Sequence, residues 1–91
     1  MNEIDAAVIC KALSDANRLQ IVRLLTKGEQ CTCDLQAYFK ISQPTLTHHM
    51  RILADCGLLS SRKDGKWNFY SLNCETLKLF REFITTFDCK C

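Results

Sequence analysis

The sequence has no apolar run that approaches the roughly 20 residues a helix needs to cross a bilayer. Its first residues are polar and acidic, without the hydrophobic core of a secretory signal. It also has no internal repeat, low-complexity stretch or linker. These absences predict a cytoplasmic protein with no membrane partner, and at 91 residues we expect one domain over the range 1–91.

The chain also lacks a large excess of charge of one sign. It has 12 basic and 10 acidic side chains, a net charge of +2, which is too small to identify a nucleic-acid-binding protein on its own. The positions of the basic side chains must therefore decide that question. Apolar residues make up 47% of the chain, and the surplus beyond one small core could line a subunit interface.

Two thiol patterns are missing as well: a Cys-x-x-Cys pair and a catalytic Cys-His-Asp set. Seven cysteines are nevertheless present, and an odd number in a reducing compartment is not a disulfide framework. The count instead indicates thiolate chemistry, either metal binding or redox sensing. We do not expect an enzyme.

Hydrophobic periodicity predicts a mainly α fold with one β-hairpin (α+β), in the order α-α-α-α-β-β-α. Asn2 and Asp15 are expected N-caps, and Asp64-Gly65 is a strong hairpin signal. The expected helices cover 2–13, 16–27, 33–39, 42–56 and 74–87, and the expected hairpin covers 58–70.

Apolar side chains at helical spacing define the expected faces of these helices. In the first and last helices the stripes are Ile4, Ala7, Val8 and Ala12, and Leu77, Phe80, Ile84 and Phe87. The broad face of the second helix, expected to be largely buried, is Leu19, Ile21, Val22, Leu24 and Leu25. The inward side chains of the third and fourth helices are Leu35, Tyr38, Phe39, Leu46, Met50 and Leu53.

The helix at 42–56 has the features of a DNA recognition helix. Pro44 is tolerated only in a first turn, so the helix starts there, capped by Ser42 or Gln43. A short helix and a tight turn precede it, which is helix-turn-helix topology. Polar side chains suited to base edges or phosphates gather near its start. They are Gln43, Thr45, Thr47, His48 and Arg51.

The hairpin places Arg62, Lys63 and Lys66 around one tip, a wing suited to a minor groove or the flanking phosphates. A solvated basic hairpin beside an ordinary polar helix is the alternative. The two features together, in this order, favour a winged helix-turn-helix that binds double-stranded DNA. His48 and His49 are unsuited to sharing a metal, because neighbours on a helix point about 100° apart; we expect His48 outward and His49 partly buried.

The chain resembles the ArsR/SmtB family of metal-responsive repressors, and its arsenic-responsive branch most. The residues that carry this resemblance span nearly the whole chain: Asp15-Ala16-Asn17-Arg18, Cys31-Thr32-Cys33-Asp34-Leu35, the run from Ser42 to Leu53, Gly57-Leu58-Leu59 and the run from Arg62 to Tyr70. The resemblance implies a homodimer joined through its first and last helices, here 4–13 and 77–87. It implies repression of an operator until metal binds, with Gln43, Thr45, Thr47 and His48 facing the groove.

Cys31-x-Cys33 is the expected inducer site. Trivalent arsenic and antimony, As(III) and Sb(III), are soft ions that prefer three thiolates. Residues i and i+2 of a regular helix point about 200° apart, so both cysteines can hold one ion only if the backbone there is extended or bent open. Clamping them would distort the first helix of the helix-turn-helix and misplace the recognition helix.

The third ligand is open. Relatives often carry a further cysteine where this chain has Gln36 and Ala37. The candidates are Cys89 and Cys91 on the tail, Cys56 and Cys10. The alternative is that Cys10, Cys56 and Cys74 are small buried hydrophobes, which we favour for Cys10 and Cys74. The last helix has no histidine, which argues against zinc, nickel or cobalt there but does not exclude an all-cysteine zinc site.

Two other inducers stay open at this point. A sensor of Cd(II) or Pb(II) would use Cys31, Cys33 and two further thiolates. A redox regulator would oxidise Cys31–Cys33 or the tail pair, although a disulfide between residues i and i+2 is expected to be strained. No organic cofactor is expected.

Overall fold

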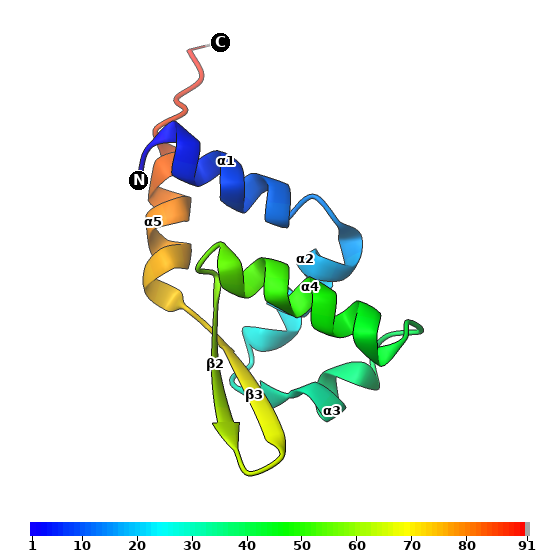
Figure 1. The fold of residues 1–91 in the computed structure, drawn as a ribbon. Helices are drawn as coiled ribbons and strands as arrows, with labels where there is room; N and C mark the ends of the chain where they lie inside the picture. The colour runs from blue at the N-terminus through cyan, green and yellow to red at the C-terminus, as the bar shows by residue number, and fades with distance from the viewer. Residues whose placement is uncertain (91) are drawn as a thin grey trace.

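In the computed structural model, which describes residues 1–90, the chain folds into five helices and a three-stranded antiparallel sheet (Figure 1). The elements are α1 (Glu3–Ala12), α2 (Ala16–Leu25), β1 (Gln30–Cys31), α3 (Thr32–Gln36), α4 (Gln43–Asp55), β2 (Leu59–Asp64), β3 (Trp67–Leu72) and α5 (Cys74–Thr85). The five predicted helices and the hairpin are confirmed, with helix ends shifted by a few residues. Cys91 lies outside the described residues.

Polar side chains cap the helices and set where they begin. Asn2 Oδ1 accepts the Asp5 backbone N–H at 2.9 Å, and Ser42 Oγ accepts that of Thr45 at 3.3 Å. Asp15 Oδ1 accepts two such bonds, from Asn17 and Arg18, and the bond from Arg18 is the main reason that the pKa of Asp15 is lowered. The caps predicted at Asn2, Asp15 and Ser42 are confirmed.

The strand β1 is a feature that the periodicity did not predict. Its two residues pair with β3, Gln30 opposite Tyr70 and Cys31 opposite Phe69, so the sheet order is β1-β3-β2. A strand this short has no periodic pattern, because only its pairing with a distant segment defines it. The structure therefore fixes Cys31 against the wing.

The hairpin turn is also shifted by one residue from the expected Asp64-Gly65. Asp64 pairs with Trp67, which leaves Gly65 and Lys66 as the two central residues. Gly65 has φ of 59° and no non-glycine residue in the described chain has positive φ. A glycine alone at the first central position is the pattern of a type II′ turn, whose twist matches that of the flanking strands.

The core lies between α1, α2, α3, α4 and the start of β2. As predicted, α4 turns Leu46, Met50 and Leu53 inward, and each has no exposed surface. The full cluster is Ile9, Ala12, Ile21, Leu24, Leu25, Leu35, Leu46, Met50, Leu53, Leu58 and Leu59. This packing fixes the position of α4, because its buried face contacts α1, α2, α3 and β2.

Two apolar side chains that were expected to be buried, Leu19 and Tyr38, are instead exposed. Leu19 on α2 is 52% exposed, and Tyr38, which lies beyond the end of the short α3, is 56% exposed. On α1 the buried side chains are Ala6, Ile9 and Ala12, whereas Ile4, Ala7 and Val8 point outward. No side chain of α5 is fully buried. The outer faces of α1 and α5 are thus apolar and uncovered in one chain.

Within residues 1–90 there is no helix with the length and apolar character to cross a membrane.

Arg18 joins α2 to both α1 and α4. Its Nε donates to the carbonyl of Ala12 at 2.6 Å, and its Nη1 lies 3.1 Å from His49 Nδ1. Because a guanidinium only donates, the His49 nitrogen accepts. His49 is 8% exposed, so its predicted partial burial is confirmed.

We expect Arg18→Met to destabilise the fold by about 1–3 kcal/mol, because it leaves two part-buried acceptors, the Ala12 carbonyl and His49 Nδ1, without their donor. Urea denaturation of this variant measures the change in the free energy of unfolding. Arg23→Met, at an exposed position of the same helix, is the matched control and should change it by less than about 0.5 kcal/mol. Equal effects of the two substitutions would contradict the role of Arg18.

Candidate nucleic-acid interface and thiol centre

The outer face of α4 gathers most of the predicted recognition side chains. A shallow hollow on this face is lined by Gln43, Pro44, Thr47, His48 and Arg51. The predicted outward position of His48 is confirmed.

Thr45 is also exposed, but its hydroxyl accepts a hydrogen bond from Ser42 Oγ at 2.9 Å. It therefore belongs to the cap of α4 and does not line this hollow.

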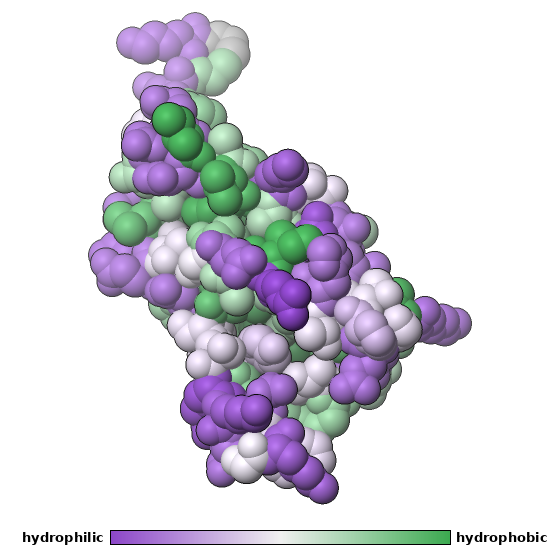
Figure 2. All heavy atoms as spheres, in the orientation of Figure 1, coloured by the Kyte–Doolittle hydropathy of each residue, from purple (hydrophilic) through white to green (hydrophobic). Residues whose placement is uncertain are grey.

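The wing presents its three predicted cations differently. Lys63 is exposed, and Lys66 Nζ lies 5.4 Å from the centre of the Trp67 ring. Arg62 lies 4.5 Å over the Phe69 ring. Its Nε and Nη2 donate to the two carboxylate oxygens of Glu29 at 2.8 and 2.7 Å. Figure 2 shows a strongly hydrophilic surface over the hairpin. The pairing with Glu29 was not predicted, since 33 residues separate the partners.

This ion pair predicts a pH dependence of stability. The hydrogen bond from Arg62 lowers the pKa of Glu29 from its ordinary 4.5. A carboxyl whose folded pKa is lowered stabilises the fold above its unfolded pKa, and that contribution is lost as the pH falls through the folded value. We expect Glu29→Gln to lower Tm slightly at about pH 7, with a difference that shrinks toward about pH 3. Thermal melts with Glu75→Gln as control test this, and a difference that does not change with pH would contradict it.

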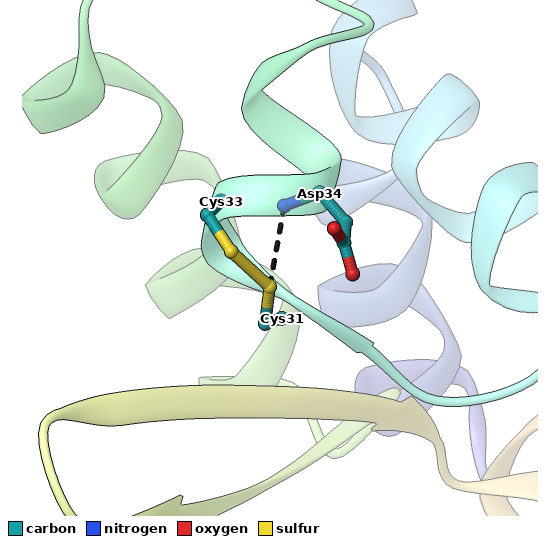
Figure 3. A group of neighbouring side chains, drawn as sticks. All are labelled: Cys31, Cys33 and Asp34. Atoms are coloured by element: carbon teal, nitrogen blue, oxygen red, sulfur yellow. Dashed lines mark hydrogen bonds between the residues drawn. A yellow bond between two sulfur atoms is a disulfide. The ribbon is translucent and has the colours of Figure 1, made fainter.

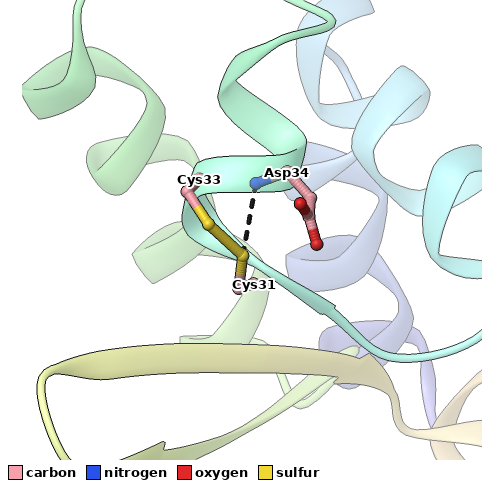
Figure 4. Close-up of a disulfide and its surroundings, with 3 residues drawn as sticks. All are labelled: Cys31, Cys33 and Asp34. Carbon is pink, nitrogen blue, oxygen red and sulfur yellow. Dashed lines mark hydrogen bonds between the residues drawn. A yellow bond between two sulfur atoms is a disulfide. The ribbon is translucent and has the colours of Figure 1, made fainter.

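Cys31 and Cys33 meet because the backbone is extended at the first of them. Cys31 is the N-cap of α3 with φ of −81° and ψ of 161°, and its sulfur accepts the Asp34 backbone N–H at 3.3 Å. The two sulfurs are joined in a disulfide, and the Cα atoms are 5.4 Å apart (Figures 3 and 4). The structure thus meets the first of the two conditions for a shared ion, an extended backbone at Cys31. This Cα separation lies within the ordinary range for a disulfide.

The pair forms a small cluster of metal-ligating atoms with Asp34. The two sulfurs and a carboxylate oxygen of Asp34 all lie within 4.8 Å of one another. Figure 3 shows the carboxylate beside the cysteine pair. Cys31 is buried, whereas Cys33 and Asp34 are exposed. Two sulfur ligands suit a soft ion once the disulfide is reduced. Sequence reasoning did not count Asp34 among the ligands.

The remaining cysteines lie elsewhere in the chain. Cys10 on α1 and Cys74 on α5 are exposed, so the expectation that they are buried hydrophobes is wrong. Cys56 is half-buried at the end of α4, with its sulfur 3.2 Å from the Leu53 carbonyl. Cys89 belongs to the tail that follows α5, and Figure 1 shows this tail leaving the molecule at the end opposite α3 and the hairpin tip. Among residues 1–90, no third thiol joins the cluster at Cys31 and Cys33.

One hollow connects the thiol centre to the recognition helix. It has a volume of 350 Å³ and lies between α3, the start of α4 and the wing. Its lining includes Cys33 and Gln36, Gln43 and Thr47, and Trp67 and Tyr70. We refer to it as the α3–wing hollow. The exposed cysteine of the pair and two recognition side chains thus share one surface.

The sequence pattern described as "Bacterial regulatory protein, arsR family" matches residues 15–61. That range contains α2, the thiol centre and all of α4. An arsenical resistance operon repressor of Staphylococcus aureus is 49% identical over 73 residues, which are 80% of this chain and 70% of that protein.

Two solved structures have the same fold. The crystal structure of a possible transcriptional regulator for arsenical resistance matches with a TM-score of 0.78 and 34% identity, over 85% of this chain and 80% of the other. The solution structure of a homodimeric winged helix-turn-helix DNA-binding domain from Mycobacterium bovis, described as a possible ArsR-family regulator, matches with a TM-score of 0.75 and 25% identity, over 90% and 77%.

Proposed function

We propose that this chain, which belongs to the arsR family of bacterial regulatory proteins, represses transcription as an operator-bound homodimer that trivalent arsenic or antimony releases. The family consists of regulators of transcription and not of enzymes. One observation carries the proposal: Cys33, Gln43 and Thr47 line the same α3–wing hollow. An ion held by the cysteine pair would therefore lie beside the side chains that read DNA.

The DNA contacts follow from the chemistry of the outer face of α4. Gln43 can pair with adenine through two hydrogen bonds, the Thr47 methyl can touch a thymine methyl, and Arg51 can reach guanine or phosphate. Lys63 and Lys66 on the wing would lie along phosphates and release counterions. Arg62 can join them only by sharing or leaving Glu29, which holds it in the free protein.

We propose that the dimer forms through α1 and α5. These helices contact each other, and Figure 2 shows hydrophobic surface at their end of the molecule. Ile4, Val8 and Phe87 are 76, 53 and 69% exposed, and covering such apolar side chains favours association. The homodimeric protein of similar structure supports a dimer, and the exposed apolar side chains are the reason for assigning it to α1 and α5. A two-fold dimer predicts a palindromic operator.

Release would be transmitted through α3. Gln36 Nε2, at the end of α3, donates to the Ile41 carbonyl at 2.6 Å, in the turn that leads into α4. At the other end Cys31 is paired with β3. An ion that opened the spacing of Cys31 and Cys33 would shift α3 against both neighbours. The recognition helix α4 and the wing would then no longer be positioned to contact the DNA at the same time.

The ligand set favours trivalent arsenic or antimony over cadmium or lead. The described chain brings two sulfurs and one carboxylate together. Cadmium and lead sites of this kind were expected to use four thiolates, so they would need two more sulfurs from the tail or from the partner. In the cytoplasm, where we place the protein, thiol reductants keep such a pair reduced.

The test begins with duplex DNA selected by the reduced protein from a randomised library. Gel shifts on that duplex are then titrated with arsenite, antimonite, Cd(II), Pb(II) and Zn(II). We expect a palindromic site and release at the lowest concentrations by arsenite and antimonite. Failure to bind any duplex at low salt would overturn the repressor, and release by cadmium alone would overturn the choice of inducer.

Thiol-redox control is a second candidate, favoured by the disulfide between Cys31 and Cys33. Peroxide would take two electrons from the dithiol, with water as the other product, and oxidation would fix α3 in one conformation. In metal-free buffer, peroxide should then release the selected duplex and dithiothreitol should restore binding. Operator affinity that is equal in the oxidised and reduced protein would eliminate this candidate.

A further inference from the structure

We infer that the cysteine pair is a receptor for monosubstituted trivalent organoarsenicals, R–As(OH)2, whose organic group occupies the α3–wing hollow. This inference rests on the proposed function, because it uses the same two thiols. It goes further by assigning a ligand class and the side chains that select it.

The first argument is the number of sulfurs. Inorganic arsenite has three exchangeable oxygens and is best satisfied by three thiolates. The cluster in the described chain supplies two, with the Asp34 carboxylate as the remaining ligand atom. An arsenical that already carries one carbon substituent has only two exchangeable oxygens. Two thiols therefore complete its coordination, and no further cysteine is needed.

The second argument is the space beside the exposed cysteine. The α3–wing hollow has a volume of 350 Å³, within the range of about 300–1,000 Å³ that small-molecule sites occupy. Cys33, Trp67 and Tyr70 line it together. Trp67 is 48% exposed and Tyr70 is half-buried. A methyl or phenyl group on arsenic would thus meet aromatic surface, which favours a ring through stacked or edge-to-face contact.

The third argument concerns the residue on α3 that lines the same hollow. Gln36 donates its amide N–H to the Ile41 carbonyl, while its Oε1 is buried with no hydrogen-bond partner. This side chain supplies no sulfur, and Cys33 is the one cysteine in the lining of the hollow. Because the site offers no third thiolate, the third bond of the arsenic atom would be the one to its own carbon substituent.

The binding step balances without a change in the oxidation state of arsenic. A phosphine reductant first supplies two electrons to the disulfide. One water gives its oxygen to the phosphine, which becomes a phosphine oxide, and its two protons to the sulfurs, which become thiols. R–As(OH)2 then forms one As–S bond to Cys31 and one to Cys33. Two As–O bonds break, and each hydroxide leaves as water with one thiol proton. In the product, arsenic stays trivalent, bridges the two sulfurs and directs R away from them.

Occupancy would also act on DNA binding directly. The organic group would share the hollow with Gln43 and Thr47, so it would obstruct the recognition face as well as move α3. Phenylarsine oxide, which is hydrated to the dihydroxy form in water, should therefore release the selected duplex at a concentration at least about tenfold lower than arsenite.

The experiment uses the full-length, phosphine-reduced protein with phenylarsine oxide, methylarsonous acid and arsenite. Native mass spectrometry counts arsenic per chain, and competition with dithiothreitol gives relative affinities. Fluorescence reports on Trp67, which is the one tryptophan of the chain. We expect one phenylarsenic per chain, a quenched Trp67, and affinity in the order phenyl, methyl, arsenite.

Two variants separate this inference from the function on which it rests. Trp67→Ala should weaken phenylarsenic binding by about 3- to 10-fold and leave arsenite unchanged, whereas Cys33→Ser should weaken both. If phenylarsenic binds no more tightly than arsenite, or Trp67→Ala affects neither, the inference fails while the proposed function stands. If no arsenical binds the pair, both fail.

Discussion

Cys31→Ser and Cys33→Ser proteins are expected to stay on the operator at arsenite concentrations that release the unchanged protein. A serine oxygen is a hard donor that does not replace a thiolate toward a soft ion. Loss of one of two chelating groups should raise the arsenite concentration for half-release by about 10²–10⁴-fold. Gel shifts with graded arsenite measure that midpoint.

Operator affinity without arsenite should hardly change in these variants. In Cys31→Ser the new hydroxyl would still cap α3, because it can accept the Asp34 N–H that the sulfur now accepts. Cys10→Ser and Cys74→Ser, at exposed cysteines on other helices, are the controls and should release normally. Normal release by both Cys31→Ser and Cys33→Ser would remove the thiol centre from the mechanism.

Replacing Gln43 and Arg51 together by alanine should produce the second large effect, a loss of operator binding. Each good base contact contributes about 1–3 kcal/mol, and a homodimer presents each side chain twice. We expect the affinity to fall by at least about 100-fold. Fluorescence anisotropy on the selected duplex measures it, and the arsenic affinity of the variant should be unchanged.

The matched control for this variant is Gln20→Ala/Arg23→Ala. Both side chains are exposed on α2. This helix contacts α4, so the control removes the same types of side chain next to the recognition helix but not on it. The control should bind within about twofold of the unchanged protein. A twofold or smaller loss in the Gln43/Arg51 variant, with its helical circular dichroism intact, would show that α4 does not read this DNA.

The recognition helix was predictable because its signals are local. Ser42 and Pro44 fix where α4 begins, and Leu46, Met50 and Leu53 repeat at helical spacing, so one face must be buried and the other must be exposed. The wing was predictable for the same reason, since Gly65 marks the turn.

Features that depend on distant partners were not predictable. The two residues of β1 form a strand only because β3 pairs with them, and Glu29 finds Arg62 across 33 residues. The geometry of the thiol centre follows from the same pairing. Helix geometry supplied the condition that the backbone must be extended or bent open there, and the tertiary structure supplies the extended backbone at Cys31.

The apolar stripes of α1 and α5 show a different limit. A stripe of apolar side chains predicts that one face of the helix is covered, but it does not tell whether the chain's own core or another subunit covers it. Ile4 and Val8 were found at helical spacing, yet the chain's own core is covered by Ala6 and Ile9 from the neighbouring face. We propose that the second subunit of the dimer covers the stripe that is exposed in one chain.

The central claim is that the thiol centre and the recognition helix are two ends of one switch. The most direct test measures operator affinity of the same reduced protein with and without one equivalent of arsenite, while mass spectrometry of the peptide containing Cys31 and Cys33 confirms where arsenic is bound. We expect the bound arsenic to weaken operator binding by about 5- to 150-fold. Arsenic bound at Cys31 and Cys33 with operator affinity unchanged would contradict the claim.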